Sequence, residues 1–93
     1  MTKKDIVIDI AERPELSSLT QVEIKKVLQS TLDHVIESLA KGQTIELRNF
    51  GVFKVKTRKG RMARNPKTGQ KVPVPERKVV VFKPGLIMKK MVH

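Results

Sequence analysis

The chain has 93 residues, of which 39% are hydrophobic and only three are aromatic, so it can form one small domain with a modest core. The absence of cysteine excludes disulfides and thiolate metal sites and suits the reducing cytoplasm. The N-terminal residues MTKKDIVIDI interrupt their apolar run with Asp5 and Asp9, which argues against a signal peptide and a membrane span. We therefore expect a cytoplasmic protein with no membrane partner.

The formal net charge of +11 is concentrated in the second half of the chain. Residues 1–47 contain six Lys or Arg and eight Asp or Glu, a net charge of −2, whereas residues 48–93 contain fourteen and one, a net charge of +13. A positive charge gathered in one half of the chain favours binding to polyanions, namely nucleic acid, anionic membranes or acidic proteins. A basic surface kept only for solubility is the alternative, but such surfaces usually mix both signs of charge.

The first half predicts two helices. Thr2 with Asp5 forms the pattern of a capping box, and a helix should follow from about Lys3 to Arg13, where Pro14 ends it because the residue before a proline is disfavoured in the α region. Residues 14–19 should form a turn.

A second capping box, Thr20 with Glu23, precedes an amphipathic pattern that predicts a helix of about twenty residues. Gly42 suits a C-cap with positive φ, so this helix should end near Lys41.

After Gly42 the apolar period changes from 3.6 to 2, which predicts strands over residues 44–47 and 52–57. In the second of these strands, apolar and lysine residues alternate, so one face should be apolar and the other cationic. Residues 78–83, KVVVFK, predict a strand that is buried on both faces, which a lone chain of this size could not cover without a partner subunit. Residues 86–92 can form a short last helix.

Between these strands, residues 58–75 form a stretch that we call the arm. The arm is rich in Arg, Lys, Pro and Gly and cannot bury a core of its own. Within it, Asn65-Pro66-Lys67-Thr68-Gly69 predicts a type I turn whose Gly69 takes a left-handed conformation and closes a hairpin. A cationic ribbon with a proline at its tip fits a DNA groove, because arginine suits a narrow minor groove and an apolar ring can wedge between base steps.

Three segments, IELRNFGVFKV at 45–55, ARNPKTG at 63–69 and RKVVVFKPG at 77–85, closely resemble the HU/IHF family of bacterial histone-like proteins, and the likeness covers essentially the whole chain. The resemblance implies an α+β fold with two N-terminal helices, a three-stranded antiparallel sheet with a long β-ribbon arm, and a short C-terminal helix. It further implies an intertwined dimer. In this division of the chain, residues 1–42 are the helical dimerisation part, and residues 43–57 and 76–84 form a sheet saddle. Residues 58–75 are the DNA-binding arm, and residues 85–93 form the C-terminal helix.

The resemblance also assigns roles to individual residues. Pro66 would intercalate between base steps, with Arg64 and Asn65 contacting the groove beside it. The other implied DNA contacts are those of the arm, Arg58, Lys59, Arg61, Lys67 and Lys71, and those of the saddle and flanks, Lys3, Arg48, Lys54, Lys56, Lys83 and Lys89. Glu46 and Arg48 match positions that IHF-like members place near the DNA flank, although a solvated edge residue explains Arg48 equally well.

The dimer core would contain Phe50, Phe53 and Phe82. Compared with many family members, Asn49 replaces a glycine before Phe50.

The implied function is that of an architectural protein of the nucleoid, which binds and bends duplex DNA and compacts it mostly without sequence specificity. A site-selective bender like IHF, and a heterodimer in place of a homodimer, stay open as alternatives. An RNA-binding protein is a weaker alternative, because the chain offers no aromatic platform for bases, and structured RNA is at most a secondary ligand. His34 and His93 have no partnered nucleophile, so we expect no enzyme, no cofactor and no metal site.

Overall fold

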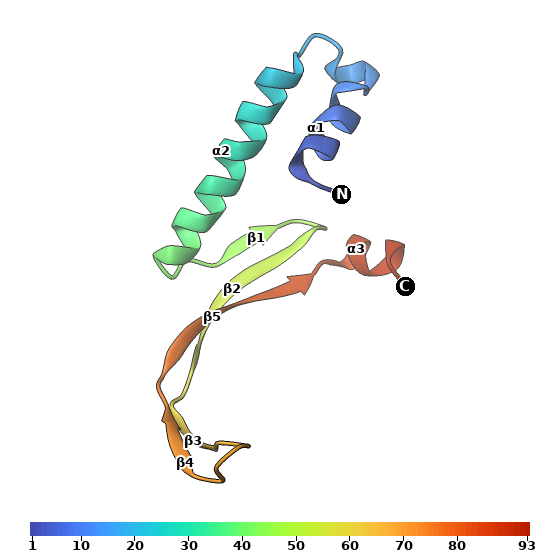
Figure 1. The fold of residues 1–93 in the computed structure, drawn as a ribbon. Coiled ribbons are helices and arrows are strands. Elements are labelled where there is room, and N and C mark those ends of the chain that lie inside the picture. Colours follow the sequence, from blue (N-terminus) through green and yellow to red (C-terminus); the bar gives the residue numbers. More distant parts are fainter. The chain divides into compact units, whose positions relative to one another are not determined.

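The computed structural model describes residues 1–93, which form two units, Met1–Glu37 and Ser38–His93. Three helices, one 3₁₀ helix and five antiparallel strands make up the chain (Figure 1). Their bounds are α1 Lys3–Ala11, η1 Pro14–Leu16, α2 Gln21–Ala40, β1 Ile45–Leu47, β2 Gly51–Arg58, β3 Arg61–Arg64, β4 Lys71–Val74, β5 Arg77–Pro84 and α3 Leu86–Met91. The predicted α+β fold is thereby confirmed. None of the helices is both long and apolar enough to cross a membrane.

Both predicted capping boxes are present. The backbone N–H of Thr2 donates to Asp5 Oδ2 at 2.8 Å, and the Thr2 hydroxyl accepts from the Asp5 backbone N–H at 3.5 Å. At the start of α2, the Thr20 backbone N–H donates to Glu23 Oε1 at 3.0 Å, and the Thr20 hydroxyl accepts from the Glu23 N–H at 3.1 Å. These bonds satisfy N–H groups that the first turn of a helix leaves without partners.

Helix α1 ends two residues earlier than predicted, at Ala11 and not at Arg13. Glu12 is its C-cap, and Arg13 already has the extended conformation, with φ −70° and ψ 130°. The proline explains the difference, because it excludes Arg13 from the α region and the chain must leave the helix before that residue. Pro14 then begins the short helix η1, where its missing N–H costs no hydrogen bond.

The core of the first unit is small. Val7 of α1 and Ile24 of α2 are its buried apolar side chains, with 5% and 6% of their surface exposed. Larger apolar residues of α2 stay in solvent in the single chain, for example Val27 at 67% and Ile36 at 64% exposed. The second helix therefore presents apolar surface that this chain does not bury.

The end of α2 follows the prediction. Gly42 has φ +82°, and its N–H donates to the Leu39 carbonyl at 2.9 Å, while the Gln43 N–H donates to the Ser38 carbonyl at 3.0 Å. A left-handed residue just past the last turn lets the chain reverse and satisfy these carbonyls.

In the second unit, β1, β2 and β5 form an antiparallel sheet in the order β1-β2-β5, and β3 and β4 form a separate two-stranded sheet. The register pairs Ile45 with Phe53 between β1 and β2, and Phe53 with Phe82 between β2 and β5. Because directly opposite residues share a face of the sheet, apolar residues from all three strands lie on one surface.

A tight turn joins β1 to β2. The Phe50 N–H donates to the Leu47 carbonyl at 3.0 Å, and Asn49 has φ +68°, which together describe a type II turn. The position favours glycine, and asparagine is among the few other residues that tolerate it, which explains how Asn49 can stand there. The Gly85 N–H donates to the Phe50 carbonyl at 2.8 Å and so ties this turn to the start of α3.

The single chain does not bury β5 on both faces, and the predicted burial was tied to a partner subunit that the single chain lacks. Val79 and Val81 are half-buried on one face, whereas Val80 and Phe82 on the other face are 59% and 37% exposed. β5 lies at the edge of the three-stranded sheet, and the chain's own residues leave the surface of Val80 and Phe82 uncovered.

Candidate nucleic-acid interface

The two long limbs of the second unit form one ribbon, which we define as residues 51–64 paired with residues 71–84. In the β2–β5 ladder and in the β3–β4 ladder, the numbers of paired residues always sum to 135, as in Phe53 with Phe82 and Arg64 with Lys71. The register is therefore the same on both sides of the interruption at residues 59–60 and 75–76. Figure 1 shows the two limbs running together from β2 and β5 into β3 and β4. With a constant register, side chains of the same alternation share one surface in both ladders.

One of these surfaces, which we call the cationic surface, collects positive charge along the whole ribbon. Every member is exposed, and the members come from even positions of the first limb and odd positions of the second. They are Lys54, Lys56, Arg58 and Arg64 from the first limb, and Lys71, Arg77 and Lys83 from the second. Among the strand residues the only carboxylate is Glu46, which lies opposite Val52 and so at the sheet end of this surface. A continuous cationic strip of this kind attracts a polyanion.

The opposite surface is different in kind. Phe53, Val55, Val80 and Phe82 make its sheet end apolar. Arg61, which pairs with Val74, lies on this surface in the arm, whereas Lys59 lies in the interruption between β2 and β3 and belongs to neither ladder. The structure therefore separates one of the predicted arm contacts, Arg61, from Arg58, Arg64 and Lys71.

The arm ends in a closed turn. The Asn65 N–H donates to the Gln70 carbonyl, and the Gly69 N–H donates to the Asn65 carbonyl, both at 2.7 Å. The Asn65 side chain accepts from the Lys67 N–H at 2.9 Å, and Gly69 has φ +72°, as the sequence predicts. These bonds fix the turn and leave Pro66 exposed at its outer end. The side-chain oxygen of Asn65 is thus engaged within the turn itself.

At the base of the arm the ladder is interrupted at residues 59–60 and 75–76. A Cβ atom on Gly60 would lie 3.0 Å from the Val74 carbonyl oxygen and 3.3 Å from the Glu76 nitrogen, so the two backbones approach closely here. Another residue at position 60 would require the backbone at Val74 or Glu76 to move by a few tenths of an ångström. Glycine therefore suits the close approach of the two limbs at this junction.

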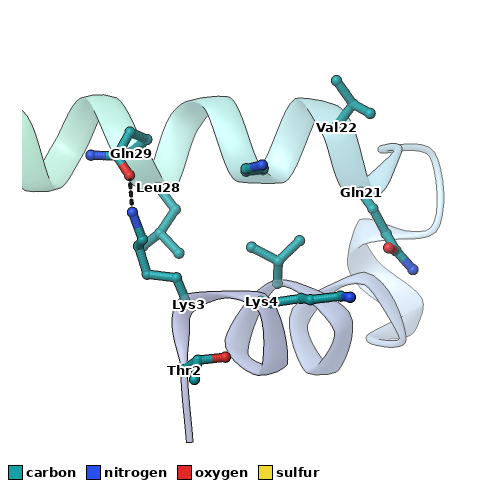
Figure 2. A pocket seen from close by; sticks show the side chains of 9 residues that line it. Thr2, Lys3, Lys4, Gln21, Val22, Leu28 and Gln29 are labelled. Atoms are coloured by element: carbon teal, nitrogen blue, oxygen red, sulfur yellow. Dashed lines mark hydrogen bonds between the residues drawn. The ribbon is translucent and has the colours of Figure 1, made fainter.

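The other predicted contacts lie outside the ribbon. Arg48 is exposed in the turn between β1 and β2, and Lys89 is exposed in α3. Lys3 belongs to α1 in the first unit, and its ammonium donates to the Gln29 side-chain oxygen of α2 (Figure 2).

A cavity of about 600 Å³ lies between α1 and α2 beside this bond (Figure 2). Val7, Val22 and Leu28 give it apolar walls, and Lys3, Lys4 and Lys25 line it together with amide and hydroxyl groups. The positive groups come from both helices. No three His, Cys, Asp or Glu side chains in the chain gather to hold a metal ion.

The three phenylalanines form one cluster in the second unit. Ring centroids are 4.6 Å apart for Phe53 and Phe82, 5.7 Å for Phe50 and Phe82 and 6.5 Å for Phe50 and Phe53. A Cβ atom on Gly51 would overlap the ring of Phe82, so this glycine leaves the space that the ring occupies beside β2. The cluster is still partly open in the single chain, since Phe50 is 48% exposed.

Sequence reasoning missed Arg77, which the structure places directly opposite Arg58 on the cationic surface. The sequence contains the information needed to find it, because the predicted turn at residues 65–69 limits the register in which the two limbs can pair. Pairing residues outward from that turn brings Arg77 to Arg58.

Comparison with known proteins gives a consistent result. Residues 1–93 match the family described as bacterial DNA-binding protein. Integration host factor subunit alpha from two strains of Cereibacter sphaeroides is 40% identical over 74 residues, which cover 80% of this chain and 74% of the relative.

Solved structures of similar proteins cover nearly the whole chain. A chain of Anabaena HU cocrystallised with DNA has a TM-score of 0.85 at 34% identity and covers 99% of this chain and 97% of its own. A point mutant of HU from Thermotoga maritima has a TM-score of 0.69 at 27% identity over the full length of both chains. A mutant of transcription factor 1, solved in solution, has a TM-score of 0.64 at 32% identity and covers 98% of this chain and 89% of its own.

Proposed function

The chain belongs to the family of bacterial DNA-binding proteins that includes HU and integration host factor, and we propose that it is an architectural protein that enters the minor groove, bends duplex DNA and compacts the nucleoid. The family is one of DNA-binding proteins and not of enzymes. The groove, the bend and the mostly non-specific mode of binding are our proposal.

The cationic surface of the ribbon is the observation that carries this proposal. Seven exposed Lys and Arg side chains follow one surface from the sheet to the tip of the arm. Duplex DNA carries a phosphate charge about every 1.7 Å of its axis, so an extended strip can neutralise several phosphates at once. Release of their counterions supplies binding free energy that does not depend on sequence.

The tip of the arm supplies the bending step of the mechanism. Pro66 is exposed at the end of a turn whose backbone groups are held by Asn65 and Gln70. Proline has no N–H to leave unsatisfied between stacked bases, and its ring is rigid. Insertion of such an apolar wedge unstacks a base step and kinks the duplex, a device of minor-groove architectural proteins of which HU and IHF are themselves standard examples.

The functional form is proposed to be a homodimer. Val80, Phe82 and Phe50 are exposed apolar residues near one another in the second unit, and a second copy of the chain would cover them. Two arms per particle would then hold one duplex at two positions. Pairing with a paralogue would use the same surfaces.

Site-selective bending is the second candidate function. The similarity to integration host factor subunit alpha over 74 residues favours it, and Glu46 and Arg48 are the residues that would read the flank of such a site. General compaction needs only contacts with phosphates and DNA shape.

Selection from a pool of randomised duplexes at near-physiological salt tests these functions. We expect retention of duplexes without enrichment of a motif. Enrichment of one motif would favour the site-selective function. Failure to retain any duplex, with retention of a structured RNA competitor, would contradict the proposal of a DNA-bending protein.

A further inference from the structure

Two arginines face each other at the point where the sheet gives way to the arm. Arg58 of β2 and Arg77 of β5 are direct partners in the last rung of their ladder, and both are exposed. Directly opposite side chains of an antiparallel pair have Cβ atoms only about 4.5–5.5 Å apart, and like charges in such a pair destabilise the sheet. The protein therefore maintains a repulsive pair at this junction.

The surroundings of this rung do not neutralise the pair. On the same surface, the next rung toward the sheet joins Lys56 to Val79, which adds a further positive charge. Toward the arm, the corresponding positions are Gly60 and Pro75, which carry no charge. Glu76 is the one carboxylate in residues 48–93, and it lies outside the ladder, in the interruption between β4 and β5.

The same rung is also open to a ligand. Gly60 has no side chain, and the two limbs lie close together there, so the first limb places no side chain beside the arginines on the arm side. Guanidinium groups donate paired hydrogen bonds to the oxygens of a phosphate, and two of them around one anion turn a repulsive pair into an attractive site.

We propose that Arg58 and Arg77 together form a binding site for a single backbone phosphate of DNA at the base of the arm. This site rests on the proposed DNA-binding function and adds to it a shared contact and a residue, Arg77. The rung of Arg64 and Lys71 repeats the arrangement near the tip. Arg58 and Arg64 are six positions apart in the first limb, which is about 20 Å of strand, so the arm would be anchored at both of its ends.

The test compares Arg58→Gln, Arg77→Gln and the double variant with the unaltered protein. Affinity for one duplex is measured over a range of salt concentrations, and thermal unfolding is measured without DNA. Lys78→Gln is the matched control, because it removes one charge from the neighbouring position on the opposite surface.

If the two arginines of each arm share one phosphate, the double variant should lower the magnitude of the salt slope by about 1.8, because the proposed dimer has two arms and each phosphate on duplex DNA contributes about 0.9. Two separate phosphates for each arm would lower it by about 3.6, which would overturn the proposal. Each single variant should bind about tenfold more weakly, and Lys78→Gln should bind nearly as well as the unaltered protein. An equal loss in Lys78→Gln would mean that only the general charge matters, and would also overturn it.

Without DNA, Arg77→Gln should unfold at a higher temperature than the unaltered protein at low salt, because the repulsion with Arg58 is removed. The difference should shrink as salt screens the charges. An Arg77→Gln variant that is less stable at low salt would show that the pair is not repulsive and would contradict the site. If the unaltered protein binds no duplex, the proposed function fails as well, whereas an unchanged slope in the double variant of a binding protein overturns this site alone.

Discussion

Phe53 and Phe82 face each other across β2 and β5, with ring centroids 4.6 Å apart, and Phe82 is nevertheless 37% exposed in the single chain. A second copy of the chain is proposed to cover this cluster. Phe82→Ala should then lower the free energy of unfolding by about 3 kcal/mol or more, as is usual for an aromatic residue removed from a core. Met62→Ala is the control, since Met62 is a 60% exposed residue of the arm.

Chemical unfolding at several protein concentrations measures this effect. The midpoint of the unaltered protein should rise with concentration, because association stabilises the folded state by mass action. Equal, small losses in both variants and a midpoint independent of concentration would argue for a folded monomer.

Arg61 and Arg64 test the assignment of the cationic surface. They are the same residue type in the same strand, but they lie on opposite surfaces of the ribbon. Arg64→Gln should lower the magnitude of the salt slope by about 1.8, for one phosphate at each of the two arms of the proposed dimer, and weaken binding, whereas Arg61→Gln should change both much less. Titration of a fluorescent duplex at several salt concentrations measures the slopes. If Arg61→Gln has the larger effect, the opposite surface of the arm faces the DNA.

For the unaltered protein, a dimer that neutralises roughly six to ten phosphates should show a slope of about −5 to −9. A flat response to salt would contradict an interface made of phosphate contacts.

Pro66→Ala tests the wedge at the tip of the arm. The variant should bend an intact duplex much less than the unaltered protein does, because the ring is no longer available to open a base step. On a nicked duplex, where the kink costs little, its affinity should fall less. Energy transfer between dyes at the two DNA ends measures the bend, and Pro73→Ala, within β4, is the control. Equal losses on intact and nicked DNA would exclude intercalation by Pro66.

Asn49 tests the backbone conformation of the turn between β1 and β2. Asn49 has φ +68°, a left-handed conformation. Asn49→Ala should destabilise the protein by about 1–2 kcal/mol, because this conformation is costly for a residue that has a Cβ and no short polar side chain to form a local hydrogen bond. Asn49→Gly should leave stability unchanged or raise it slightly. Thermal unfolding of the two variants decides the point, and a loss in Asn49→Gly as large as in Asn49→Ala would show that the side chain and not φ is important.

The stability of the protein should depend on pH through the carboxyl group of Glu23. The Thr20 backbone N–H, followed by the Thr20 hydroxyl, donates to the Glu23 carboxylate and holds the pKa of Glu23 below its usual value of 4.5. This contribution to stability is present above pH 4.5 and is lost as the pH falls through the lowered pKa. Glu23→Gln should therefore lose less stability than the unaltered protein on acidification below pH 4.5, as followed by unfolding at a series of pH values. Parallel pH profiles would contradict the prediction.

Local patterns predicted most of the fold. The capping pairs Thr2–Asp5 and Thr20–Glu23, the C-cap Gly42 and the turn glycine Gly69 all have the expected geometry, because each depends on residues within a few positions of one another. The end of α1 was predicted two residues too late. Pro14 holds Arg13 in the extended conformation, so the helix has to end before Arg13 and its last residue is Ala11.

Features that depend on distant residues were harder to predict. The burial of β5 depends on what covers Val80 and Phe82, which lies outside the single chain. The prediction assigned the cations of the arm to DNA as a single group. The register of β3 and β4 places them on two surfaces, with Arg61 on one and Arg64 on the other. Arg77 was overlooked for the same reason, since its role depends on its partner in the other limb.

The constant register of the ribbon also restricts how its length can change in evolution. Deleting one residue from a single limb would turn every side chain beyond that point to the other surface, so the cations near the tip would no longer align with those of the sheet. An insertion or deletion preserves both this alignment and the pairing of the limbs only if the same even number of residues changes in each limb. Relatives with longer or shorter arms should therefore differ by equal, even numbers of residues on the two sides of the NPKTG turn.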